Sequence, residues 1–236
     1  YAFRESIAFL NHALALLHSL PPSGTTVELE LELQMALCTA WAAVTDYLGD
    51  EVASAYRRGL ELCRQVQHVP HLFTVLWGLH EVALYRGDLR ESLELAQQCL
   101  EITGELDDPG LQLEAHHAAW GPYFFLGEHA QAFRHMEHGL ALYDRAVHEP
   151  LSVEYGVHDA AGCALTLQAM GLWNLGHIDQ ARLKLEAAIA LGDRLTMPAN
   201  VADVYGHCGL ILHLLREPQR AQSLAGKMLQ ITSEKR

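Results

Sequence analysis

A repeated helical pattern limits what this chain can fold into more than any other feature of its sequence. The stretches that begin at Gly87, Gly127 and Gly176 each carry a small residue five positions after the glycine, and apolar or small residues nine, twelve and thirteen positions after it. The small residues are Ser92, Ala132 and Ala181. Glycine adopts the left-handed conformation that ends many helices, and a small residue allows the next helix to cross close to its predecessor. The pattern therefore predicts pairs of helices, with the second helix of each pair beginning just after the glycine.

Weaker copies extend this pattern along the chain. The small position falls at residues 6, 55, 92, 132, 181 and 221, which gives spacings of 49, 37, 40, 49 and 40 residues. Apolar residues recur at three- and four-residue intervals nearly everywhere, and alternating strand patterns are missing. We therefore expect an all-α fold of about eleven helices in antiparallel pairs, with the first helix unpaired. The predicted repeats are roughly 1–20, 27–67, 70–104, 111–143, 157–192 and 199–233, and the two spacings of 49 predict extra residues around 19–30 and 144–156.

The pattern resembles the tetratricopeptide family over almost the whole chain. This resemblance implies a right-handed α-solenoid and a single repeat domain over residues 1–236. Some segments are also similar to the C-terminal repeat region of large bacterial signalling proteins, where a class III nucleotide cyclase or a kinase precedes an AAA-type or STAND-type ATPase. These segments are Phe73–Leu79, Gly127–Glu128, Gly139–Asp144 and Tyr155–Asp159. Because Tyr1 opens the chain inside a helical pattern, we expect the chain to be a piece of a longer protein.

Composition excludes several classes of protein. The formal charge of −13 disfavours nucleic-acid binding, which needs a dense basic surface. Half of the residues are hydrophobic, which is enough for a sizeable core. The five cysteines are odd in number and form no CxxC pair, so we interpret them as reduced thiols in a cytoplasmic protein. No signal peptide or membrane span is indicated.

Enzyme and cofactor motifs are missing from the sequence. It contains no GxxxxGK[ST], GxSxG or HExxH pattern, and we expect neither catalytic residues nor a cofactor. Fifteen histidines stand out, of which His135 and His138 share a helix face and have the spacing of a weak metal pair. We expect these histidines to be exposed or singly hydrogen-bonded and no metal to be bound, with a metal-assisted hydrolytic site as an alternative. His80 occupies a packing position, and we expect it to be buried and hydrogen-bonded.

The first helix of each predicted pair supplies the candidate binding site, since in such repeats it lines the concave face. The candidate contact residues on that face are Trp77, Glu81, Tyr85, Glu114, His117, Phe124, Phe125, Met170, Trp173, Asn174 and His213. The same register adds Leu84, Thr166, Asp203, Gly206 and Leu210. Aromatic side chains suit the capture of a peptide or helix, although a neighbouring helix could equally fill this groove. Tyr143, His148, Tyr155, His158 and Asp159, in the long connection, form a second candidate contact site, and the alternative is a packed loop that covers a repeat edge.

These observations favour a non-catalytic module for protein interaction and regulation. We expect it to bind a protein segment, a peptide or a neighbouring domain and to regulate the upstream ATPase, cyclase or kinase domains that the resemblance implies. An alternative is a small-molecule sensor arm of a STAND-type ATPase. Self-association is also expected if the first helix exposes an unpaired apolar face. Neither nucleic acid nor a membrane is an expected partner.

Overall fold

The protein is all-helical in the part of the chain that the structure describes. The structure is a computed structural model that describes residues 2–21, 23–45, 47–66, 69–104, 106–156 and 158–233. The chain divides into two compact units, Tyr1–Leu106 (unit 1) and Asp107–Arg236 (unit 2). This division falls between the predicted repeats at 70–104 and 111–143. No described helix combines the length and apolar character needed to span a bilayer.

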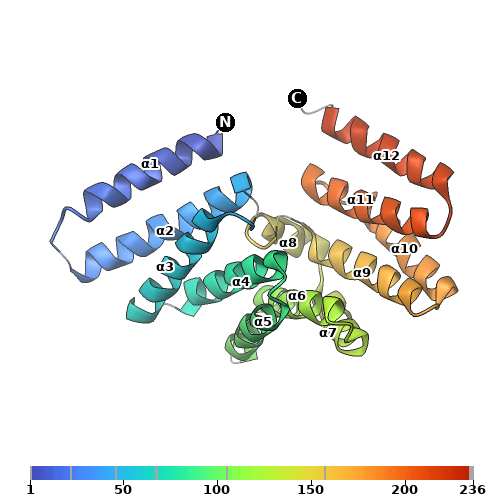
Figure 1. The fold of residues 1–236 in the computed structure, drawn as a ribbon, viewed down its shortest axis with the longest axis horizontal. Coiled ribbons are helices and arrows are strands. Elements are labelled where there is room, and N and C mark those ends of the chain that lie inside the picture. Colours follow the sequence, from blue (N-terminus) through green and yellow to red (C-terminus); the bar gives the residue numbers. More distant parts are fainter. Residues whose placement is uncertain are drawn as a thin grey trace. The chain divides into compact units, whose positions relative to one another are not determined.

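Unit 1 contains five helices that pack on their neighbours in sequence (Figure 1). They are α1 (Ala2–Leu17), α2 (Gly24–Thr45), α3 (Asp50–Val66), α4 (Val69–Arg86) and α5 (Leu89–Gly104). The pairs are α2 with α3 and α4 with α5, while α1 packs mainly on α2. Phe73 and Trp77 of α4 are fully buried and supply much of the core. The pairs α2–α3 and α4–α5 match the predicted repeats.

Unit 2 contains three helix pairs and a structured connection. Its elements are α6 (Pro109–Phe125), α7 (His129–Leu142), α8 (Arg145–His148), the 3₁₀ helix η1 (Glu149–Val153), α9 (Ala160–Asn174), α10 (Ile178–Gly192), α11 (Pro198–Leu214) and α12 (Pro218–Ser233). The pairs are α6–α7, α9–α10 and α11–α12, and α9 also contacts α6, α7 and α11. The described residues thus form twelve α-helices. Eleven of these helices correspond to the predicted number, and α8 is an additional short helix. It lies in the segment where the spacing predicts extra residues.

Helix ends in both units follow the glycine pattern. Gly87, Gly127 and Gly176 have φ angles of 83°, 80° and 82°, which is the left-handed conformation. In each case the next residue donates its N–H to a carbonyl five residues earlier, as Asp88 does to Ala83 (2.9 Å). These hydrogen bonds satisfy carbonyl groups that the helix end would otherwise leave unpaired. The prediction of glycine-capped helices is confirmed at all three positions.

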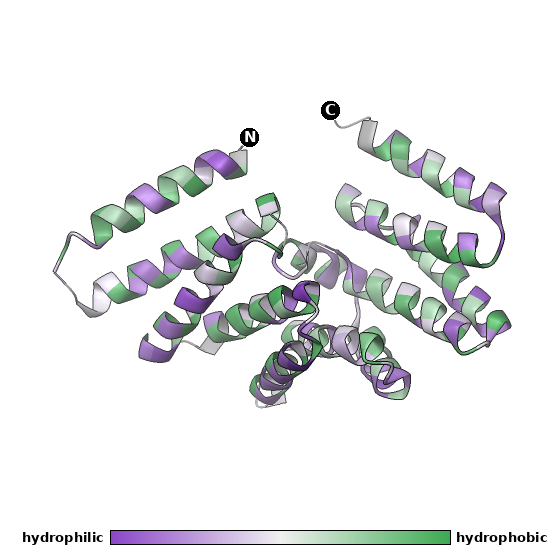
Figure 2. Cartoon of the chain, in the orientation of Figure 1, coloured by the Kyte–Doolittle hydropathy of each residue, from purple (hydrophilic) through white to green (hydrophobic). Residues whose placement is uncertain are grey.

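Four of the six small positions of the pattern are buried where helices approach each other. Ser92, Ala132 and Ala181 have no exposed surface, and Ala55 is also buried, whereas Ser6 is exposed and Ala221 is half-buried. Figure 2 shows hydrophobic and hydrophilic residues alternating along the helices, which is the amphipathic pattern of packed pairs. The buried side of each helix therefore contacts its neighbours, and the polar side stays in water.

Candidate functional site

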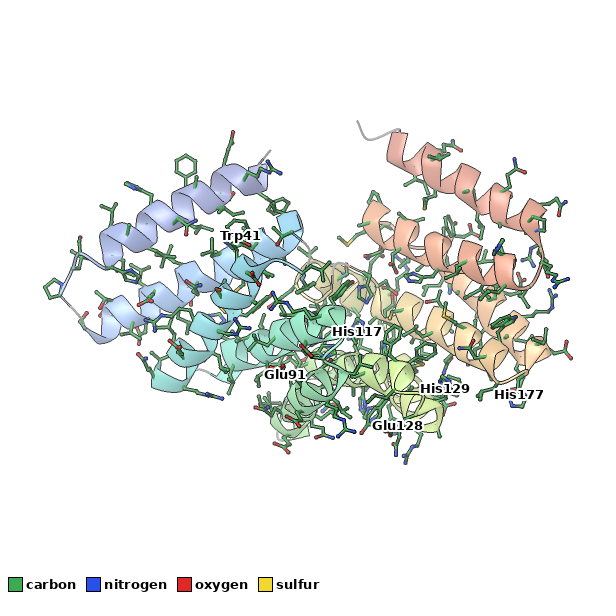
Figure 3. All side chains as sticks on the ribbon, in the orientation of Figure 1. Trp41, Glu91, His117, Glu128, His129 and His177 are labelled. Atoms are coloured by element: carbon green, nitrogen blue, oxygen red, sulfur yellow. The ribbon has the colours of Figure 1, made fainter. Side chains whose placement is uncertain are left out.

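A group of polar side chains gathers around His117 in unit 2. We call Glu114, His117, His158, Cys163 and Asp203 the His117 cluster. His117, labelled in Figure 3, lies on α6. His158 lies just before α9, Cys163 lies near the start of α9, and Asp203 lies on α11. Glu114 and His117 are buried, and the other three are half-buried. Ionisable groups so poorly exposed to water need partners within the protein.

The two histidine rings of the cluster are fixed by hydrogen bonds and stacking. The Nδ1 atom of His117 lies 2.8 Å from Oε2 of Glu114, and its ring stacks on Trp120 with the ring centroids 4.7 Å apart. The Nδ1 atom of His158 lies 2.7 Å from the carbonyl oxygen of Gly156. The two Nε2 atoms face each other at 2.9 Å. Each ring thus has one nitrogen bound to an acceptor and the other pointing at its partner ring.

Charge around His158 favours its protonated form. Burial lowers the pKa of an imidazole, but the interaction with Cys163 outweighs it, and the carboxylate of Asp203 adds to the rise, which brings the pKa of His158 to about 9. Burial alone would raise the pKa of Asp203. The hydrogen bond from His207 and the positive charge of His158 lower it instead. The cluster therefore combines one positively charged imidazole, that of His158, with the carboxylates of Glu114 and Asp203.

The long connection of residues 143–159 positions His158. The hydroxyl of Tyr143 donates to Asp159 Oδ2 (2.6 Å), and Asp159 Oδ1 accepts from the backbone N–H of Gly162 (2.8 Å), which caps the start of α9. Burial, followed by the hydrogen bond to Asp159, raises the pKa of Tyr143 well above the ordinary tyrosine value. His148, Tyr155 and Asp159 are buried, and Tyr143 and His158 are half-buried. The segment is therefore a packed connection, and its role as a partner contact stays a prediction.

Glu149 attaches the same connection to the start of α11. Its Oε1 atom accepts the backbone N–H groups of Thr196 (2.5 Å) and Met197 (2.8 Å), while Oε2 accepts from Arg145 (3.1 Å). Burial raises the pKa of this carboxyl, but these donors reverse the effect and hold the pKa below its usual value. The connection is thereby held against the segment between α10 and α11.

The predicted concave-face residues divide into buried and exposed groups. Trp77, Glu81, Glu114, His117 and Phe124 are buried, Met170 and Trp173 are half-buried, and Tyr85, Phe125, Asn174 and His213 are exposed. The five buried side chains expose almost no surface to solvent, which agrees with the alternative that neighbouring helices fill the groove. Partner binding by the exposed residues stays a prediction.

Histidines outside the cluster behave in two ways. His80 is buried and its Nδ1 lies 2.8 Å from the hydroxyl of Ser92, which confirms the predicted buried, hydrogen-bonded histidine. His116 belongs to a separate group, since its Nδ1 lies 2.9 Å from Nδ1 of His135. The ring of His138 packs edge-on against His116. The sequence pairs His135 with His138, but it gives no indication that His116 joins them from α6.

An apolar groove lies between α1 and α2 in unit 1. Its cavity has a volume of about 540 Å³ and is lined by Phe3, Ser6, Phe9, Leu10, Ala36, Thr39 and Ala40. Phe9 is 75% exposed and Phe3 is 51% exposed. The sequence predicts an apolar face on this first helix but does not identify these residues as a site.

Comparison with known proteins places the fold but not the function. No family model matches the chain. An uncharacterized protein of Rhizobium meliloti (strain 1021), R02095, is 28% identical over 196 residues, which cover 82% of this chain and 19% of that protein. The chain thus spans about a fifth of the length of this relative. The crystal structure of BtubC (BKLC) from P. vanneervenii superposes with a TM-score of 0.66 at 15% identity, over 99% of this chain and 92% of that one. This similarity shows that the chain shares the helical fold of that structure.

Proposed function

We propose that the chain is a non-catalytic regulatory module built from right-handed, tetratricopeptide-like repeats, which binds a helix of a protein partner. Support for the repeat class comes from the three left-handed glycine caps, each followed five residues later by a fully buried small residue. Support for a module within a larger polypeptide comes from the relative, which is about five times as long as the matched region. In this proposal the bound partner regulates catalytic domains of the same polypeptide.

The observation that carries the proposal is the apolar groove between α1 and α2. In the part of the chain that the structure describes, Phe3 and Phe9 beside the groove are 51% and 75% exposed, although burying such rings is strongly favourable. The residues of α2 that line it include Ala36 and Ala40, whose small side chains allow another helix to approach closely. Exposed apolar grooves of this kind are typical of surfaces that receive an amphipathic helix.

Charge indicates which helix would fit. Residues 1–106 contain six arginines, no lysine and fourteen acidic residues, so unit 1 has a formal charge of −8. A partner helix with an apolar stripe and basic flanking residues would therefore be attracted before it docks. We propose this occupant for the groove, and the association rate should fall as salt is added.

The test uses a displayed library of helical peptides of about 16 residues, long enough to form a few turns. Peptides selected against the chain should carry an apolar stripe and a basic polar face. Phe9→Glu should weaken their binding at least about tenfold, because a charge replaces an anchor ring. Phe125→Glu, in unit 2, is the matched control, since Phe125 is also an exposed phenylalanine.

Two results would overturn the proposal. One is that Phe9→Glu binds the selected peptides as tightly as the unaltered chain, while Phe125→Glu does not. The other is that sedimentation velocity shows a dimer of the unaltered chain that Phe9→Glu dissociates, since the groove would then hold a second copy of the chain.

A further inference from the structure

Two imidazoles and a thiol converge in the His117 cluster. One ring nitrogen of His117, one ring nitrogen of His158 and Sγ of Cys163 all lie within 4.8 Å of one another. The three residues come from α6, from the residue just before the cap of α9, and from the first turn of α9. Residues 41 positions apart in the sequence are thereby brought to one point.

Hydrogen bonding fixes which nitrogen of each ring is available. The carbonyl oxygen of Gly156 only accepts, so Nδ1 of His158 carries the hydrogen at 2.7 Å. A carboxylate likewise only accepts, so Nδ1 of His117 donates to Glu114 at 2.8 Å. Nε2 is therefore the nitrogen of each ring that faces the other ring, at 2.9 Å. One hydrogen lies between the two nitrogens at this distance, and a metal ion that displaces it would have both nitrogens as ligands.

We propose that His117, His158 and Cys163 bind a Zn²⁺ ion. Two imidazole nitrogens and one thiolate are the borderline-soft ligands that zinc prefers, and three protein ligands leave one tetrahedral position for water. The carboxylate of Glu114 behind His117 reproduces the carboxylate–histidine–metal arrangement that orients ligating imidazoles.

The spacing of the ligand atoms suits this ion after small adjustments. Zinc–nitrogen bonds of about 2.0 Å in a tetrahedron place two nitrogens about 3.3 Å apart, so the two rings would separate by a few tenths of an ångström from 2.9 Å. His158 lies in a connection rather than inside a helix, and so its ring can shift at low cost. His117 is held by Glu114 and by stacking on Trp120, and it supplies the fixed side of the site.

The partial exposure of Cys163 also fits a ligand. The other four cysteines, Cys38, Cys63, Cys99 and Cys208, are buried, and packing accounts for them. Cys163 is half-buried and lies beside His158, so a metal ion from solvent can reach its sulfur.

The test is metal binding by the whole chain. After treatment with a chelator, titration with ZnCl₂ in a calorimeter should give one ion per chain. Co²⁺ in place of zinc should give the intense visible bands of tetrahedral cobalt and a thiolate-to-cobalt band in the near ultraviolet. Cys163→Ser should remove the thiolate band, and Cys163→Ser and His158→Asn should each weaken zinc binding at least about 100-fold. Glu114→Gln should weaken it about 10- to 100-fold, since the amide orients His117 less strongly.

Controls separate this site from the other histidines. His135→Asn alters the group formed with His116 and His138, and Cys208→Ala removes a buried thiol of the same unit; both should keep the stoichiometry and the cobalt spectrum. Circular dichroism of each metal-free variant verifies that it is folded. The proposal is overturned if the chain binds no stoichiometric zinc, if Cys163→Ser and His158→Asn bind it unchanged, or if only His135→Asn loses it.

Discussion

Single residues at helix ends show how the repeat is encoded, and one of them departs from the pattern. Three helices are followed by a glycine in the left-handed conformation, with φ near 80°. The end of α11 has the same hydrogen bonds, from Arg216 to His213 and from Glu217 to Leu212, but Arg216 takes the left-handed conformation with φ of 61°. A side chain in this conformation crowds the backbone and costs about 1 kcal/mol.

Replacing Arg216 with glycine should therefore stabilise the protein. We expect Arg216→Gly to raise the free energy of unfolding by up to about 1 kcal/mol in urea denaturation. The matched variant is Gly176→Ala, where nothing lies within 4 Å of the added Cβ, so that only backbone strain acts. It should lower the free energy of unfolding by about 1 kcal/mol. An unchanged or lower stability of Arg216→Gly would show that the side chain is not strained.

The buried carboxylate of Glu149 should make stability depend on pH. Its pKa in the folded state lies below the ordinary value of 4.5, so the folded state favours the charged form. The stabilisation is present above the unfolded-state pKa and is lost as the pH falls through the folded-state pKa. Glu149→Gln should lower the free energy of unfolding at pH 7 by about 2 kcal/mol, because two backbone N–H donors lose a charged acceptor.

The same variant should respond less to acid. Urea denaturation between pH 7 and acidic pH should show a smaller loss of stability below pH 4.5 for Glu149→Gln than for the unaltered chain. Glu137→Gln, which changes an exposed glutamate, should keep the original dependence. Equal acid sensitivity of the unaltered chain and Glu149→Gln would contradict this role of Glu149.

At the level of elements, the close packing of α6 and α7 requires a residue without a side chain where the two helices cross. Gly139 of α7 faces Trp120 of α6, and a Cβ added at residue 139 would lie 2.7 Å from the indole ring. Trp120 is almost fully buried and cannot easily retreat. The glycine is therefore required by packing rather than by its backbone conformation, and it occupies the twelfth position after the cap glycine, where Cys99 and Ala188 stand in the other copies.

Adding a methyl group at this crossing should destabilise the pair. We expect Gly139→Ala to lower the free energy of unfolding by about 1–3 kcal/mol, despite the better helix propensity of alanine. Gly206→Ala in α11 is the control, because nothing lies within 4 Å of the added Cβ. Thermal unfolding should show a lower Tm for Gly139→Ala and a slightly higher Tm for Gly206→Ala; a rise for both would rule out the steric role of Trp120.

At the scale of the whole molecule, the sequence was sufficient for the helices but not for the site. The helical spacing of apolar residues and the identity of the cap residues can be read from a short stretch of sequence. The five helix pairs and the extra residues of 144–156 could therefore be predicted from them. Burial is not local: Trp77 and Phe124 occupy the predicted face, yet neighbouring helices cover them. A helical period identifies a face but does not show how closely the next helix approaches it.

The His117 cluster depends on contacts that no spacing rule contains. The sequence predicts His117 on the concave face and His158 in the long connection, as members of two separate sets, and it predicts Cys163 only as a reduced thiol. They meet because Asp159 caps α9 and Gly156 turns the chain with φ of 75°, which brings the ring of His158 to α6. The chain path through residues 143–159 therefore decides the site, and helical periodicity does not predict the path of a connection.

The division into two compact units predicts that a destabilising substitution in the core of one unit increases local unfolding in that unit alone. In repeat proteins each element is stabilised mainly by its neighbours, so opening is governed by nearby interfaces. Leu62 of α3 and Leu185 of α10 are both fully buried, one in each unit. Each leucine-to-alanine change should cost about 2–5 kcal/mol. Hydrogen exchange read by mass spectrometry should then accelerate in α2 and α3 for Leu62→Ala, and in α9 to α12 for Leu185→Ala. Faster exchange in both units from either change would mean that the chain unfolds as one cooperative body.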